Sequence, residues 1–107
     1  MGKTFFDKIW DAHVVADLGD GFALLHIDRH LMHDGGAPAL LAIKDQGLSV
    51  RNPELTFATA DHVITSAPGR ADMSRHAQAT LRHLRAETKA QGIRYFDLGS
   101  GGQGIIH

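Results

Sequence analysis

The stretch that decides the fold is Thr56-Phe57-Ala58-Thr59-Ala60-Asp61-His62. Small and β-favouring residues run directly into an adjacent acid and imidazole, a pattern typical of a buried strand that ends in a polar pair. Because ligands of open α/β sheets bind beyond the carboxyl ends of the strands, we expect chemistry at Asp61 and His62. An aspartate can fix the tautomer of a nearby imidazole, which then moves a proton near neutral pH. The alternative is that Asp61 caps the next segment and His62 is an ordinary loop residue.

Helical and strand patterns alternate on both sides of this stretch. The expected helices cover residues 4–12, 38–44 and 70–91, and the expected strands cover residues 13–16, 22–28, 56–60, 93–98 and 105–107. The nearly continuous apolar character of residues 22–28 is typical of a strand covered on both faces. The alternation favours a layered α/β fold with a largely parallel sheet flanked by helices, forming a single domain over residues 1–107.

The composition limits the classes of function. The chain has 107 residues, a net charge of -1 and no cysteine. The near-neutral charge gives no electrostatic reason to expect a nucleic-acid or membrane partner. Without cysteine the chain forms no disulfide, no thiolate zinc site, no thiolate nucleophile and no cysteine-held iron–sulfur cluster. No apolar run approaches the roughly 18 residues of a membrane span, and the start lacks an apolar signal core, so we expect a cytoplasmic location.

A second polar cluster runs from Asp28 to Asp34, after the expected strand 22–28. His30 and His33 are three residues apart, and imidazole and carboxylate together can hold zinc or iron. The alternative, which we favour, is a polar loop at a strand end. Residues 99–104 are glycine-rich but lack the phosphate-binding pattern, so we expect an ordinary flexible connection.

Several blocks of sequence, taken in order, agree with one known family. They are Lys3-Thr4, Asp7-Lys8, Asp11-Ala12-His13-Val14-Val15, Leu24-Leu25-His26-Ile27-Asp28-Arg29-His30-Leu31, His33, the Thr56–His62 stretch and Gln103-Gly104-Ile105-Ile106-His107. Together they resemble the amino-terminal part of the large subunit of 3-isopropylmalate dehydratases, in the aconitase superfamily. The resemblance extends over essentially the whole chain, and it implies a partial aconitase-like domain.

The resemblance also implies an activity. Its members are hydro-lyases of leucine biosynthesis that interconvert 2-isopropylmalate and 3-isopropylmalate by dehydration and rehydration, with a [4Fe-4S] cluster as Lewis acid. By the same resemblance, Asp61, His62 and His107 are expected to be catalytic. His33, Arg29 and Gln103 are expected to bind substrate.

The family's cluster-binding cysteines lie later in a much longer chain, so we expect no cofactor to be bound by this chain alone. The expected partners are the cysteine-bearing remainder of the large subunit, the small subunit or a further copy of this chain. The leading hypothesis is a truncated or stand-alone piece of a dehydratase-like hydro-lyase, inactive by itself. The alternative is a non-enzymatic module that has kept the fold and self-associates or binds a partner.

Overall fold

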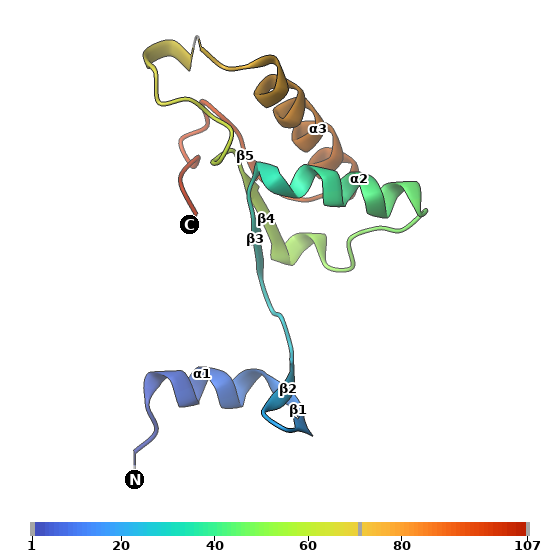
Figure 1. Cartoon of the computed structure of the whole chain (residues 1–107), viewed down its shortest axis with the longest axis vertical. Helices are drawn as coiled ribbons and strands as arrows, with labels where there is room; N and C mark the ends of the chain where they lie inside the picture. The colour runs from blue at the N-terminus through green and yellow to red at the C-terminus, as the bar shows by residue number, and fades with distance from the viewer. Residues whose placement is uncertain (1, 71, 107) are drawn as a thin grey trace.

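The computed structural model describes residues 2–70 and 72–106 and separates them into an arm and a body (Figure 1). The arm comprises α1 (Phe5–His13), β1 (Val14–Gly19) and β2 (Phe22–Leu25). The body comprises β3 (His30–Met32), α2 (Ala37–Asp45), β4 (Thr56–Thr59), α3 (Arg75–Gln91) and β5 (Arg94–Phe96), with short 3-10 turns at Asp34–Gly36, Pro53–Leu55 and Pro68–Arg70. None of the helices in the described part of the chain has the length and apolar character needed to cross a membrane.

The arm begins with the expected short helix. The Thr4 hydroxyl accepts a hydrogen bond from the Asp7 N–H at 3.1 Å, and the Asp7 carboxylate accepts one from the Thr4 N–H at 2.8 Å. This reciprocal capping box explains why α1 starts at Phe5. No residue of α1 is buried, although Phe6 and Trp10 stack on each other.

The prediction that residues 22–28 form a strand covered on both faces is wrong. β2 stops at Leu25, pairs antiparallel with β1, and leaves Phe22 70% exposed. The reason is the two-residue turn Asp20-Gly21, whose φ angles are 51° and 81°. Two positive φ angles are typical of the turn that closes a β-hairpin, so the pairing is local.

The body is built on a three-stranded parallel sheet in the order β3-β4-β5, so the parallel sheet around the decisive stretch is confirmed. The core combines Ala58 of β4 with Leu40 of α2 and Leu84 of α3. Both helices therefore pack on the sheet face that contains Ala58. On the alternate position of β3, Leu31 is 64% exposed, so the expected layered arrangement of a sheet flanked by helices is not confirmed.

Three expected boundaries differ from the structure. β3 lies inside the segment that we expected to be a polar loop after a strand, residues 28–34. The long helix begins at Arg75 and not at residue 70, because the Pro68–Arg70 turn holds Gly69 and Arg70 at φ angles of 70° and 58°. Residues 105–106 are not in a strand, and residue 107 lies outside the described residues.

The arm makes the molecule elongated. The radius of gyration is 17.4 Å, whereas a compact domain of this length has about 13 Å. Residues 26–29 run as an extended link between β2 and β3 (Figure 1). The arm therefore buries little of its apolar surface against the body.

Candidate functional site

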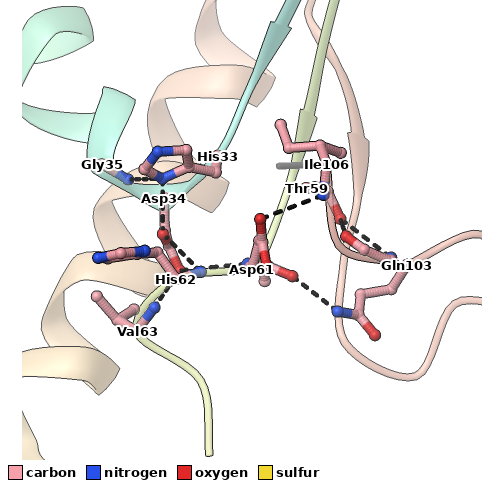
Figure 2. Close-up of polar contacts among 11 residues, drawn as sticks. His33, Asp34, Gly35, Thr59, Asp61, His62, Val63, Gln103 and Ile106 are labelled. Atoms are coloured by element: carbon pink, nitrogen blue, oxygen red, sulfur yellow. Dashed lines mark hydrogen bonds and ion pairs between the residues drawn. The ribbon is translucent and has the colours of Figure 1, made fainter.

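The site lies at the carboxyl edge of the parallel sheet. β3 ends at Met32, directly before His33 and Asp34, while β4 ends at Thr59, just before Asp61 and His62. Because the two strands are parallel neighbours, their carboxyl ends meet at one edge. The imidazole rings of His33 and His62 lie with centroids 5.3 Å apart (Figure 2). The sheet thus brings together three of the residues expected from the sequence.

Asp34 is the buried centre of this edge, with 0% of its surface exposed. Its Oδ2 accepts hydrogen bonds from the backbone N–H groups of Val63 at 2.9 Å, His62 at 3.1 Å and Asp61 at 3.3 Å. Its Oδ1 accepts from the His62 N–H at 3.1 Å and lies 3.1 Å from Nδ1 of His33. One carboxylate therefore connects the ends of β3 and β4 (Figure 2).

The hydrogen bonds decide the charge of Asp34. Burial by itself raises the pKa of this carboxyl group, because it penalises the charged form. Hydrogen bonds outweigh the effect of burial and hold the pKa of Asp34 below its ordinary value. They come from the Val63 N–H, the His33 ring and the N–H groups of His62 and Asp61. Asp34 is therefore ionised at neutral pH.

The carboxyl-terminal segment closes the other side of the site. Gln103 Nε2 donates a hydrogen bond to the Ala60 carbonyl at 2.7 Å, and the Ile106 N–H donates to Oδ2 of Asp61 at 3.2 Å. Both bonds join residues more than forty positions apart, and they hold Gln103 beside the exit of β4 (Figure 2). Gln103 is thus the fourth expected site residue that lies at this edge.

A hollow of about 290 Å³ borders Asp61 and Gln103. The other lining residues combine the polar Thr65, Ser66 and Arg70 with the apolar Ile64 and Ile105. The Arg70 guanidinium also donates to the Thr65 carbonyl at 2.6 Å. The sequence reasoning did not single out Arg70; its only local signal was the adjacent Pro68-Gly69 turn pattern.

One expected site residue, Arg29, is not brought into this constellation. Arg29 precedes β3 whereas His33 follows it, so the two lie at opposite ends of the strand. The guanidinium of Arg29 donates to the Asp28 carbonyl at 2.7 Å. His107 lies outside the described residues. The roles expected for both stay predictions.

Among the described residues, a metal site in residues 28–34 has no support. The Asp28 carboxylate bonds to the His13 ring at 3.1 Å, and that of Asp34 is occupied by backbone N–H groups. His30 opens β3, at the opposite end of the strand from His33. Within residues 2–70 and 72–106, no three His, Cys, Asp or Glu side chains are grouped to hold a metal ion. The chain also has no cysteine, so its donor set does not fit an iron–sulfur cluster.

Comparisons with known proteins agree with the resemblance seen in the sequence. Residues 7–107 match the model of the aconitase family (aconitate hydratase). The chain is 53% identical over 107 residues to the 3-isopropylmalate dehydratase large subunit 1 of Bradyrhizobium diazoefficiens. This match covers 99% of the chain and 22% of the Bradyrhizobium protein. It is 48% identical over 109 residues to the large subunit of Thermus thermophilus and 49% identical over 111 residues to that of Akkermansia muciniphila; each match covers 100% of the chain and 23% of the relative. The chain thus spans less than a quarter of the length of these relatives. No solved structure matches it.

Proposed function

Because the chain belongs to the aconitase family, we propose that it supplies the acid and imidazole side of a hydro-lyase site that other polypeptide segments complete. The reaction proposed for the completed site is the interconversion of 2- and 3-isopropylmalate by loss and re-addition of water. The observation that supports this most directly is the meeting of His33, Asp61 and His62 at the carboxyl edge of β3 and β4.

The chemistry of dehydration explains why these residue types suit the site. Water leaves when a proton is removed from one carbon and the hydroxyl group departs from its neighbour; re-addition in the opposite sense gives the isomer. Imidazole both takes and gives protons near neutral pH, so His62 is the proposed proton carrier, with Asp61 beside it and His107 as a further imidazole. His33, Gln103 and Arg29 are the proposed substrate contacts.

The [4Fe-4S] cluster associated with the family would need thiolate ligands from outside this chain, which contains no cysteine. We therefore propose that the remaining large-subunit sequence and a small subunit are its partners, in the cytoplasm. The residues described here provide proton transfer and substrate orientation only. The isolated chain is expected to be inactive.

A chimera tests the proposal. Residues 1–107 replace the aligned amino-terminal part of the Thermus thermophilus large subunit, which is then combined with its small subunit. The chimera should turn over isopropylmalate, and His62→Ala should lower kcat about 10²–10⁴-fold, the usual contribution of a positioned acid or base. His83→Ala, which removes an exposed imidazole of α3, is the matched control and should leave kcat unchanged.

Two results would contradict the proposal. One is unchanged turnover by the folded His62→Ala chimera. The other is isopropylmalate turnover by the isolated 107-residue chain after cluster reconstitution, because no second polypeptide would then be required.

A second candidate function is a partner-binding module without catalysis. It is favoured by the apolar surface of the arm, where Phe5 is 81% exposed. A folded but inactive chimera, together with a stable oligomer of the isolated chain, would support it.

A further inference from the structure

We propose that Asp34 is the positioning residue of this site. Its two carboxylate oxygens bind the exit of β4 and the ring of His33, and so hold His33 and His62 in one fixed arrangement. The catalytic meaning of this role rests on the proposed function, whereas the positioning itself can be measured without turnover.

Three backbone N–H groups beyond β4 converge on Asp34. Asp61, His62 and Val63 follow β4, so their N–H groups lie beyond the hydrogen bonds of the sheet, which ends at Thr59. All three point at the carboxylate of Asp34, with the Val63 bond the shortest at 2.9 Å. These hydrogen bonds are partly buried, so each N–H group has limited access to water and needs an acceptor, and a charged acceptor makes the stronger bonds. The direction in which Asp61 and His62 leave the strand is therefore set by Asp34.

The His33 ring also contacts the carboxylate of Asp34. Its Nδ1 lies 3.1 Å from Oδ1 of Asp34 and 2.9 Å from the backbone N of Gly35. A single nitrogen cannot donate to the carboxylate and accept from Gly35 at the same time. An unprotonated nitrogen against a buried, ionised oxygen would be repelled. Gly35 is an exposed residue, so its N–H can donate to water in place of Nδ1. Nδ1 of neutral His33 therefore holds the proton and donates it to Oδ1 of Asp34.

Because Asp34 contacts both the β4 exit and the His33 ring, an asparagine substitution at this position can test its positioning role. Asp34→Asn keeps the shape but replaces one acceptor oxygen by an NH₂ donor. If the NH₂ group faced the backbone, it would place one donor against another, the Val63 N–H. The remaining oxygen should therefore turn to the backbone, and the NH₂ group should turn to His33. His33 must then accept at Nδ1 and carry its proton on Nε2. A purely space-filling role for Asp34 predicts no such change of tautomer.

The experiment is NMR spectroscopy of the ¹⁵N-labelled chain at about pH 8, where imidazole is neutral. In the unmodified chain, the ring ¹⁵N shifts should report the Nδ1–H tautomer of His33. In Asp34→Asn they should report the Nε2–H tautomer, and amide exchange at His62 and Val63 should accelerate about tenfold because a charged acceptor is lost. Asp45→Asn, at the exposed end of α2, is the matched control and should change neither.

Several outcomes overturn the proposal. They are an Nε2–H tautomer of His33 in the unmodified chain, or unchanged tautomer and exchange in Asp34→Asn. Amide protection at Leu84 reports whether the variant is folded. If the variant does not fold, the tautomer of His33 in the unmodified chain alone decides whether the proposal stands. An inactive chimera would reject the proposed function and leave these readouts intact, so the two failures are distinguishable.

Discussion

Arg85 of α3 and Asp97 after β5 form a two-point ion pair at the edge of the body. Arg85 Nη2 donates to Oδ1 of Asp97 at 2.9 Å, and Nε donates to Oδ2. Partial burial raises the pKa of Asp97, but the Arg85 hydrogen bonds and the Leu98 N–H outweigh it, so the pKa lies below its ordinary value. A carboxyl group whose pKa is lowered by folding stabilises the protein above its unfolded pKa. That contribution is lost as the pH falls through the lowered value.

Asp97→Asn should therefore decrease the free energy of unfolding by about 1 kcal/mol at pH 7, a magnitude reduced by solvent screening of this partly exposed pair. The difference from the unmodified chain should persist down to about pH 4 and shrink below it, as the native carboxylate becomes protonated. Urea unfolding at several pH values measures this. Asp45→Asn serves as control, and a difference that grows towards acid pH would contradict the assignment.

At the same scale, the sequence predicted that Asp61 and His62 follow a strand, as they do, but it did not predict which residue supports them. Asp61 and His62 could be predicted because they follow a recognisable strand. Asp34 looked like a loop acid between a histidine and a glycine. Its burial depends on N–H groups 27 to 29 residues later, and local sequence does not encode such a contact.

Helix α3 shows what a periodic pattern can and cannot predict. Met73, Ala77, Leu81 and Leu84 recur at helical spacing, which predicted the helix. Gly92, at a φ of 73°, ends it as expected. The predicted start at residue 70 was wrong. Met73 extends the apolar spacing upstream of the helix, but the Pro68–Arg70 turn interrupts the backbone and α3 begins at Arg75. The actual start is set by Ser74, whose Oγ accepts from the Ala77 N–H at 3.1 Å.

Ser74→Ala should decrease the free energy of unfolding by about 1 kcal/mol, the usual effect of removing such a cap. Exchange of the Ala77 amide should accelerate, because it loses its acceptor, while protection at Leu84 should persist. Ser49→Ala removes an exposed hydroxyl outside any described helix or strand and should change neither measurement. Equal effects of the two substitutions would mean that Ser74 does not cap α3.

The hairpin shows why the prediction of a buried strand over residues 22–28 was wrong. The apolar run from Phe22 onward is equally typical of a buried parallel strand and of an exposed strand awaiting a partner surface. Periodicity cannot separate the two, because both produce the same pattern. The Asp20-Gly21 turn was the distinguishing signal, since it forces local antiparallel pairing.

For the whole molecule, the main departure from expectation is the separation of the arm from the body (Figure 1). The large side chains of α1 and of the hairpin are largely exposed, among them Phe5, Phe6 and Phe22. Sequence composition predicted enough apolar residues for a core, but it could not show that those of the arm lie on a separate surface. Such clustered apolar exposure is typical of a surface that packs against another polypeptide.

The exposed apolar surface of the arm leads to a prediction about association. The isolated chain should self-associate, because contact between arms is the available way to remove their apolar side chains from water. Sedimentation velocity over a range of concentrations should show a rising average mass. The double substitution of Phe5→Ser and Phe22→Ser should weaken the association at least about tenfold, since each buried aromatic ring contributes more than 1.4 kcal/mol. Leu48→Ser, which removes an exposed leucine from the body, should leave it unchanged. A chain that stays monomeric throughout would show that the arm does not bind a second arm, and the remaining large-subunit sequence would be the occupant to test next.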